Sequence, residues 1–347
     1  MPRRLAITGP HVVEVIEYQE PALGPREVRV RTQLASGKHG TTRALFDNVN
    51  FRGQRFDQEM RLFLPAGEAA GGPAAPMGTG TTGVGVVEEV GAEATRWRVG
   101  DRVFGFMDIR ETNVCDEARL WELGELDPLL ALCVEPAYVA FHCLRESPVR
   151  YGDKVAIIGL GALGLLAVRM AGGAGADLVI AVDPLPRRRK WAARHGAHEV
   201  LDPAACDVGL EVHRLTDGRG ADVAIELAGA YEALHDAIRS VRVGGTVCSA
   251  GFYQGEARGL WLGREWHHNR ISLVVPHGCG WGHPPRDFPG WDERRAYDTI
   301  VSLMRQGRFT APGLIHPVVF LDEAPRVWDL IERDPDQVIK YAVRFDG

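Results

Sequence analysis

The stretch KVAIIGLGALGLLAVRMA, residues 154–171, decides the fold because it places a glycine-rich turn between an apolar strand and a helix. Gly159, Gly161 and Gly164 form a G-x-G-x-x-G motif in that turn. Gly159 permits the tight turn, Gly161 lets the backbone approach a pyrophosphate, and Gly164 lets the helix pack close to the strand. Because free N–H groups at the helix N-terminus then face the phosphates, the stretch predicts a dinucleotide site.

An acidic residue follows at the spacing that such a site requires. Asp183 lies 183 − 164 = 19 residues beyond Gly164, near the roughly 20 expected for a carboxylate that binds the ribose hydroxyls. A carboxylate there repels a 2′-phosphate, so NAD(H) is favoured over NADP(H). The basic run 187–190 leaves three interpretations open: an arginine stacked on adenine, tolerance of NADP(H), or a solvated turn of a helix.

The stretches that follow the motif continue its pattern of apolar strands and helices. Continuously apolar strands recur in 177–184, 221–229 and 244–252, and they alternate with helical stretches. Strands covered on both faces by crossover helices have this pattern. We therefore expect an α/β domain with a doubly wound parallel sheet over residues 137–276.

The N-terminal region has a different pattern. Apolar residues alternate in 12–18, 27–34, 83–91 and 101–106, which predicts antiparallel, half-exposed strands of a partly open barrel. The tail, 277–347, is too short to stand alone easily and is assigned with residues 1–136 to one domain. Within it we expect helices over 297–307 and 323–334 and a strand over 338–345.

Two segments of the N-terminal region are harder to interpret. Residues 65–80 are rich in Gly, Ala and Pro and are expected to be irregular. The segment before them carries Phe46, Phe51, Phe56 and Phe63 and is either a lid over a cleft or a helical excursion with a small core of its own, the latter being favoured.

Composition excludes several classes of protein. The 347 residues suit two domains, and 45% hydrophobic content allows a sizeable core. A net charge of −6 argues against binding to nucleic acid or anionic membranes, and no apolar run is long enough to span a bilayer. The start lacks the apolar stretch of a signal peptide, and the six cysteines contain no CxxC pair. A cytoplasmic location is therefore expected.

With these motifs in place, the sequence resembles the medium-chain dehydrogenase/reductase family of alcohol, sorbitol and threonine dehydrogenases. The similar stretches are GPREVRVRTQLASGKHGTT (24–42), VGDRV (99–103), VEPAYVAFHCL (134–144) and GRGADVAIELAG (218–229). The resemblance implies a GroES-like barrel domain, a Rossmann domain, and an active site in the cleft between them. It also implies further cofactor-binding residues: Ala162, Leu163, Pro184, Arg188, Ala228, Gly251 and Phe252.

The sequence departs from the zinc enzymes of this family. His39 replaces their first cysteine ligand, and Gly80-Thr81-Thr82 stands where they have Gly-His-Glu. Glu135 of the hinge pair remains, but the four-cysteine structural lobe does not. A third zinc ligand would have to come from elsewhere, such as His142 or His267, so no metal is expected.

The sequence is more similar to a zinc-less branch that includes bacteriochlorophyllide a dehydrogenase. Residues 38–42 resemble that branch's Gly-Thr-Glu stretch with Thr42 replacing the Glu, and 266–270 also resembles it. Without a metal, another group must stabilise the developing alkoxide and accept the proton. Lys38 and His39 are the candidates, Thr41 matches the family's proton-relaying hydroxyl, and Glu135 orients the His or accepts the proton itself. The alternative for each is a structural polar residue on the cleft wall.

Substrate clues lie in residues 261–291, where Trp266, His267 and Trp281 bring aromatic faces beside hydrogen-bonding groups. That combination suits a sugar or polyol, or equally a subunit interface. We therefore expect an NAD(H)-dependent, zinc-independent oxidoreductase of a secondary alcohol or ketone, forming a homodimer or homotetramer. The alternatives are a quinone or enoyl reductase of the same superfamily and a non-catalytic NAD(H)-binding sensor.

Overall fold

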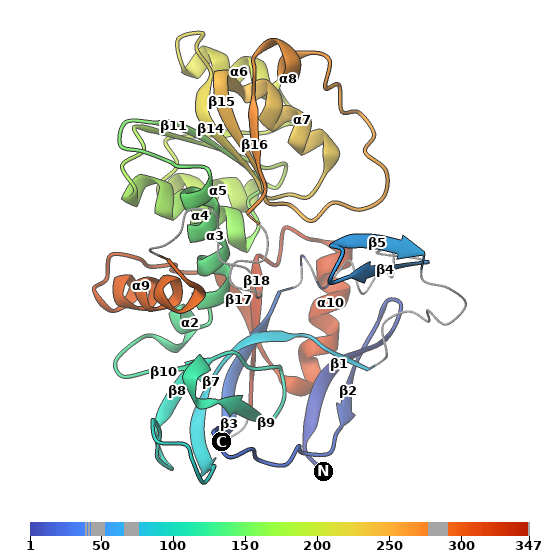
Figure 1. The fold of residues 1–347 in the computed structure, drawn as a ribbon, viewed down its shortest axis with the longest axis vertical. Helices are drawn as coiled ribbons and strands as arrows, with labels where there is room; N and C mark the ends of the chain where they lie inside the picture. Colours follow the sequence, from blue (N-terminus) through green and yellow to red (C-terminus); the bar gives the residue numbers. More distant parts are fainter. Residues whose placement is uncertain (39, 41, 43–52, 66–75, 277–290, 346–347) are drawn as a thin grey trace.

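The computed structural model describes residues 1–347 except 39, 41, 43–52, 66–75, 277–290 and 346–347. Its described part has two sheet-based units stacked along the long axis of the molecule (Figure 1). The hinge helix α3 (Val134–Glu146) lies between them. None of the described helices is long and apolar enough to cross a membrane.

The upper unit contains a six-stranded sheet in the order β13-β12-β11-β14-β15-β16, and all of its strand pairs are parallel. The strands are β11 (Lys154–Ile158), β12 (Leu178–Val182), β13 (Glu199–Leu201), β14 (Ala221–Glu226), β15 (Val241–Ser249) and β16 (Ser272–Val274). The helices are α4 (Ala162–Gly173), α5 (Pro186–Arg194), α6 (Val208–Leu215), α7 (Tyr231–Ser240) and α8 (Glu265–His268).

Both faces of this sheet are buried, as its apolar strands predicted. Val155 and Ile157 of β11 pack into one core with α3 and α4, whereas Ala156 and Ile158 pack into a second core with α6 and α7. Side chains alternate across a strand, so a strand covered on both faces must be apolar throughout. The predicted doubly wound parallel sheet is confirmed.

The lower unit is built from N-terminal and C-terminal strands together. Its main sheet has the order β10-β8-β7-β3-β18-β17, with β9 also paired to β3. The strands of this unit are β1 (Arg3–Gly9), β2 (Val12–Glu17), β3 (Glu27–Gly37), β6 (Met77–Gly78), β7 (Gly80–Val90), β8 (Arg102–Gly105), β9 (Thr112–Asp116), β10 (Leu120–Glu122), β17 (Ile315–Phe320) and β18 (Lys340–Arg344). Its helices are α2 (Pro128–Ala131), α9 (Glu293–Arg305) and α10 (Ala324–Arg333), with short 3-10 turns at Glu117–Arg119 and Leu321–Glu323.

The tail pairs with the N-terminal strands as expected, since β18 is antiparallel to β3. The four predicted N-terminal strands correspond to β2, β3, β7 and β8, and the predicted tail elements correspond to α9, α10 and β18. The prediction that 65–80 is irregular is wrong at residue 65, at 77–78 and at residue 80, which belong to β5, β6 and β7, whereas 66–75 lie outside the described residues.

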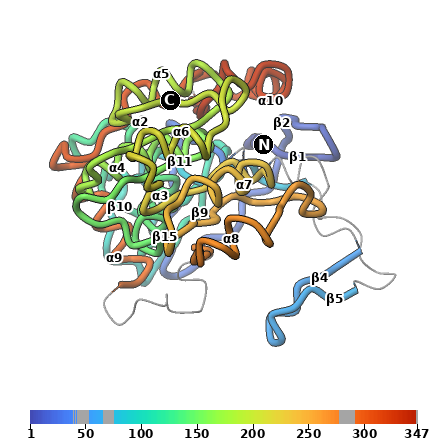
Figure 2. Tube along the Cα trace, turned by 90° about the horizontal axis from the view of Figure 1, so that it is seen from above, coloured from blue at the N-terminus to red at the C-terminus, as the bar shows by residue number. Residues whose placement is uncertain are grey.

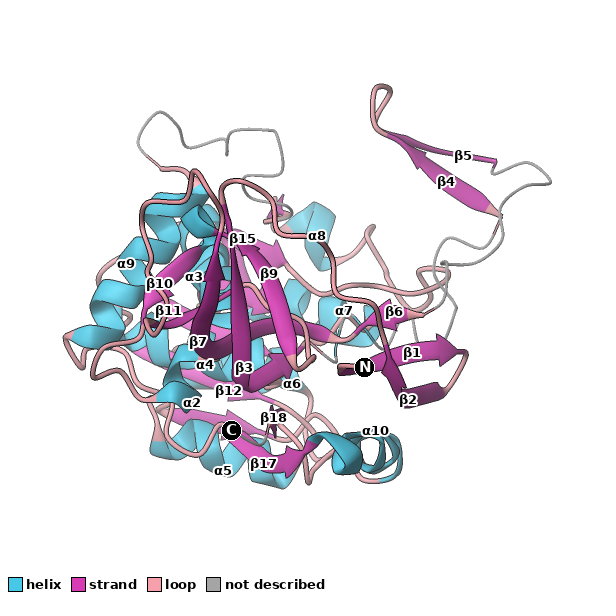
Figure 3. Ribbon diagram, turned by 90° about the horizontal axis from the view of Figure 1, so that it is seen from below, coloured by secondary structure: helices cyan, strands magenta, loops and turns pink. Residues whose placement is uncertain are grey.

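The prediction of a helical excursion before residue 65 is wrong for its described part. Residues 54–65 form a hairpin of β4 (Gln54–Asp57) and β5 (Leu62–Pro65), with Phe56 and Phe63 in ring contact at 5.0 Å. Opposed aromatic and apolar side chains stabilise an antiparallel strand pair as readily as a helix face. The phenylalanines therefore do not distinguish a helix from a hairpin. The hairpin stands apart from the body of the molecule (Figures 2 and 3). Phe46 and Phe51 lie outside the described residues.

Candidate active site

The glycine turn after β11 lies at the point where the sheet changes winding direction, between β11 and β14. Gly159 has φ +90°, and a Cβ atom there would lie 2.4 Å from the backbone nitrogen of Ala228. At Gly164 a Cβ atom would lie 1.9 Å from the Gly159 carbonyl oxygen. At Gly161, by contrast, a Cβ atom would meet no described atom within 4 Å. Glycine is therefore required sterically at two positions, and the third leaves open space at the N-terminus of α4, where Ala162 and Leu163 begin the helix.

Asp183 is buried at the end of β12, beside this turn. Its Oδ2 accepts a hydrogen bond from Leu160 N at 2.7 Å, and its Oδ1 accepts one from Leu185 N at 2.8 Å. A carboxylate has about four acceptor positions, so acceptor capacity remains for ribose hydroxyls. Pro184, next in the chain, is exposed.

Arginines of the basic run 187–190 bind neighbouring carboxylates and backbone carbonyls of the protein. Arg188 lies 3.7 Å from Asp183 and donates to the carbonyl of Pro335 at 3.2 Å. Arg189 donates to the Asp183 carbonyl at 2.7 Å and pairs with Asp202. The interpretation of this run as a solvated helical turn is therefore wrong for these arginines, although Lys190 is exposed.

A buried carboxylate that the sequence reasoning missed lies on the other side of the switch point. Glu226 ends β14, as Asp183 follows β12, and it is fully buried. Its Oε1 accepts hydrogen bonds from Ala228 N at 2.7 Å and Gly229 N at 2.8 Å. Its Oε2 accepts one from the hydroxyl of Tyr253. An acidic residue at the end of an apolar strand was the signal that could have revealed it.

The loop after β15 lies against these groups. A Cβ atom at Gly251 would lie 2.4 Å from Glu226 Oε2, and Phe252 is 40% exposed despite its size. The structure therefore brings Ala228, Gly251 and the glycine turn together, as predicted for one binding site.

Lys38 and Glu135 form an ion pair where the two units meet. Lys38 follows the end of β3, Glu135 lies in the first turn of α3, and Nζ is 3.0 Å from Oε1. The side chains are 28% and 13% exposed. The second oxygen of Glu135, Oε2, is buried without a hydrogen-bond partner among the described residues. It is therefore available to accept a hydrogen bond from a bound molecule.

A second lysine, also missed by the sequence reasoning, lies beneath this pair. Lys340 on β18 is buried, and its Nζ donates to the carbonyl of Gly37 at 2.9 Å. Burial lowers the pKa of Lys340, and the nearby ammonium of Lys38 lowers it further. Electrostatic interactions with Cys133 and Glu135 oppose this shift. Two lysines and one carboxylate thus gather around the end of β3.

We expect Lys340 to make the free energy of unfolding rise between neutral and alkaline pH. Its pKa is lower in the folded chain than the ordinary 10.5, so the unfolded chain binds more protons in that range and stability increases with pH. Lys340→Met removes this contribution. Urea unfolding of both proteins at about pH 7 and about pH 9.5 checks it, with exposed Lys190→Met as the control. Parallel pH dependences for wild type and Lys340→Met would contradict the expectation.

The remaining predicted residues lie apart or outside the described part of the chain. His39, Thr41 and Trp281 are not described. Trp266 and His267 lie on α8, which packs beside α7 on the far side of the upper unit from β3 (Figure 1). Trp266 packs against the α6–α7 core and His267 is exposed, so the structure does not bring either to Lys38.

The residues described around Lys38 do not fit a catalytic zinc ion. Such a site needs about three protein ligands. Glu135 is paired with Lys38, and His142 Nε2 lies 3.7 Å from Glu146 Oε1 within α3. Thr81 and Thr82 supply hydroxyls only. Within the described ranges, no three His, Cys, Asp or Glu side chains gather in a way that could hold a metal.

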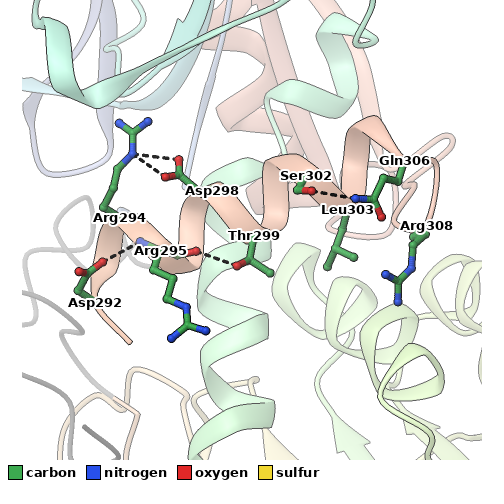
Figure 4. A pocket seen from close by; sticks show the side chains of 9 residues that line it. All are labelled: Asp292, Arg294, Arg295, Asp298, Thr299, Ser302, Leu303, Gln306 and Arg308. Atoms are coloured by element: carbon green, nitrogen blue, oxygen red, sulfur yellow. Dashed lines mark hydrogen bonds and ion pairs between the residues drawn. The ribbon is translucent and has the colours of Figure 1, made fainter. Parts of the chain in front are cut away.

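A hollow of about 580 Å³ lies elsewhere, on the outer face of α9 (Figure 4). It is lined by Asp292, Arg294, Arg295, Asp298, Thr299, Ser302, Leu303, Gln306 and Arg308. Arg294 is paired with Asp298 2.9 Å away. The hollow is lined by none of the candidate site residues, so the candidate site is identified by its side chains and not by this hollow.

Comparisons with known proteins agree with this architecture. Residues 24–125 match the model of the alcohol dehydrogenase GroES-like domain, and residues 162–291 match that of the zinc-binding dehydrogenase. The chain is 34% identical to the D-guloside 3-dehydrogenase of Escherichia coli K12, over 99% of this chain and 100% of that protein.

Solved structures show the same fold. The 2R,3R-butanediol dehydrogenase of Bacillus subtilis superposes with a TM-score of 0.77 at 24% identity, covering 100% of both chains. A zinc-binding dehydrogenase of Sinorhizobium meliloti bound to NADP gives 0.78 at 22% identity, covering 99% of both chains. The predicted combination of a GroES-like domain with a doubly wound parallel domain is confirmed.

Proposed function

The chain belongs to the medium-chain, zinc-binding dehydrogenase family, and from that premise we propose that it transfers hydride between NAD(H) and a ring carbon of a sugar glycoside, interconverting a secondary alcohol and a ketone. The printed activity of its E. coli relative, a D-guloside 3-dehydrogenase, supports the substrate class. The observation that carries the chemistry is the Lys38–Glu135 pair with its unpartnered carboxylate oxygen.

The cofactor half of the proposal rests on the glycine turn. The open space at Gly161 and the N-terminus of α4 suit a pyrophosphate, and the buried Asp183 carboxylate suits ribose hydroxyls. We also assign Arg188, Pro184, Ala228, Gly251 and Phe252 to the cofactor site. Nicotinamide, when bound, supplies the hydride acceptor or donor.

The substrate half assigns complementary roles to the ion pair. Lys38 donates a hydrogen bond to the substrate oxygen and stabilises the negative charge that develops there on oxidation. Glu135 holds the ammonium through Oε1, and its free Oε2 accepts the hydroxyl proton. We extend the proposal to His39 as an alternative base and Thr41 as a relay. We assign no step to a metal and propose a zinc-independent branch, which the poor fit of the described side chains around Lys38 to zinc supports.

We also propose domains over 1–136 with 277–347 and over 137–276, and a homodimer or homotetramer in the cytoplasm. Among the described residues β16 is the edge strand of its sheet, and the exposure of Leu273 (38%) and of Val275 just after it (62%) supports association. Light scattering that reports a monomer would contradict this part.

Turnover with a panel of methyl glycosides, polyols and simple secondary alcohols, followed by nicotinamide absorbance, tests the function. We expect glycosides to exceed the simple alcohols by roughly tenfold or more in kcat/KM, because a site built for hydroxyls rejects analogues that lack them. We expect kcat/KM with NAD to exceed that with NADP by roughly tenfold or more. Asp183→Asn is expected to reduce this ratio.

Other results of these assays would support one of the alternative functions. Reduction of quinones or enones with NADPH would indicate the reductase alternative, and tight dinucleotide binding without turnover would indicate a sensor. Stoichiometric zinc in the purified, active protein would overturn the zinc-independent assignment.

A further inference from the structure

The hydrogen bonds around Glu226 define its charge. Every group that contacts the carboxylate is a donor: the N–H groups of Ala228 and Gly229 on Oε1, and the hydroxyl of Tyr253 on Oε2. Ser249 Oγ donates in turn to the Tyr253 oxygen at 3.0 Å, which leaves the tyrosine proton directed at Glu226. The two N–H groups on Oε1 cannot accept a hydrogen bond, and the Tyr253 hydroxyl, as placed, donates to Oε2, so the network suits an ionised carboxylate.

No cation neutralises this buried charge among the described contacts. Burial raises the pKa of Glu226, and the largest opposing effects come from the Tyr253 hydroxyl and from the N–H groups of Gly229, Ala228 and Gly251. Neutral donors stabilise a carboxylate but leave its net negative charge in place. That charge therefore acts electrostatically on a molecule bound beside the loops that follow β14 and β15.

The loops that Glu226 holds are those that flank the switch point. Ala228 abuts Gly159 of the glycine turn, and Gly251 abuts Glu226 itself. Ligands of doubly wound sheets bind outside the carboxyl ends of the strands at that point. Glu226 thus places a fixed negative charge at the base of the proposed dinucleotide site.

We propose that Glu226 raises the affinity of the site for the oxidised cofactor relative to the reduced one. The nicotinamide ring of NAD⁺ carries a positive charge, and that of NADH is neutral, so a fixed carboxylate stabilises the first and not the second. This inference rests on the proposed use of NAD(H). Glu226 is a positioning residue that also sets the relative affinity of the two cofactor forms, and its charge helps NAD⁺ to compete with NADH for the site.

Calorimetric titration with NAD⁺ and with NADH, on wild type and Glu226→Gln, tests the inference. Glutamine keeps the shape, its oxygen accepts from the Ala228 and Gly229 N–H groups, and its amide donates to the Tyr253 oxygen, so chiefly the charge is lost. A unit charge acting across roughly 10–15 Å at an effective dielectric constant of about 20 changes an affinity by about five- to twentyfold. We expect the Kd of NAD⁺ to rise by that factor and the Kd of NADH to change by less than about twofold.

Two variants act as controls. Glu232→Gln removes an exposed carboxylate from α7 in the same unit and is expected to leave the Kd ratio unchanged. Tyr253→Phe removes the donor that most strongly opposes the raised pKa of Glu226, so the carboxylate is protonated more readily and the ratio is expected to shift toward NADH, by no more than in Glu226→Gln. Tyr253→Phe also tests the inference if Glu226→Gln does not fold by circular dichroism.

The results that would contradict this inference differ from those that would contradict the proposed function. Equal weakening of NAD⁺ and NADH in Glu226→Gln, or no change in either, would overturn the charge effect, as would a shift toward NAD⁺ in Tyr253→Phe. If wild type binds neither dinucleotide, the proposed function fails and this inference fails with it. If wild type binds both and the ratio does not respond, only this inference fails.

Discussion

A single methyl group added at residue 164 is expected to destabilise the protein by about 1–3 kcal/mol and to abolish dinucleotide binding. The Cβ of Gly164→Ala would lie 1.9 Å from the carbonyl oxygen of Gly159. That neighbour is backbone, so it cannot rotate away as a side chain would. Either α4 moves off the sheet or the glycine turn deforms, and both displace the phosphate-binding N–H groups. Urea unfolding and calorimetric titration with NAD⁺ check the two effects.

Two other glycines serve as matched controls. Gly172→Ala, in the same helix, would place its methyl group where no described atom lies within 4 Å, so we expect it to be neutral or to stabilise by up to about 1 kcal/mol. Gly161→Ala meets equally open space and should fold normally, but its methyl group enters the proposed phosphate position and should weaken NAD⁺ binding. Normal stability and binding in Gly164→Ala would show that the close contact is not maintained in solution.

The glycine turn could be predicted from the sequence because its requirements are local. Gly159, Gly161 and Gly164 lie within one strand-turn-helix unit, and Asp183 follows on the next strand of the parallel sheet. The continuous apolar strands reveal burial on both faces by the same local reasoning. These features depend on neighbours in the chain, which a sequence displays directly.

Glu226 and Lys340 depend instead on tertiary contacts. Tyr253 approaches Glu226 from 27 residues away, and Gly37 approaches Lys340 from 303 residues away. The sequence shows that Glu226 ends an apolar strand, but it does not show these partners, and Lys340 is one charged residue among many. Only the pairing of β18 with β3 brings Lys340 under the end of β3. The aromatic cluster of 261–291 stays a prediction for either a substrate or an interface, since a cluster in sequence does not say which face of the fold it serves.

Loss of the Lys38 ammonium is expected to lower kcat by about 10²–10³-fold without changing the Kd of NAD⁺. Lys38→Met removes the proposed hydrogen bond to the substrate oxygen, and Glu135→Gln removes the proton acceptor together with the anchor of Lys38. Because general acid–base groups contribute about 10²–10⁴-fold, Glu135→Gln is expected to lose a similar factor.

The double variant distinguishes a cooperating pair from two independent residues. If Lys38 and Glu135 act as a unit, combining the substitutions costs little more than the larger single loss, because the second change removes a group that no longer functions. Lys154→Met is the matched control: its Nζ lies 3.6 Å from Asp177, and its side chain is 26% exposed, close to the 28% of Lys38. Lys154 begins β11, at the opposite end from the glycine turn, so its loss should leave kcat unchanged. Steady-state kinetics with the most active glycoside, alongside calorimetric titration of NAD⁺, measures both quantities. Wild-type kcat in Lys38→Met would remove the ion pair from the mechanism and leave His39 as the group to test.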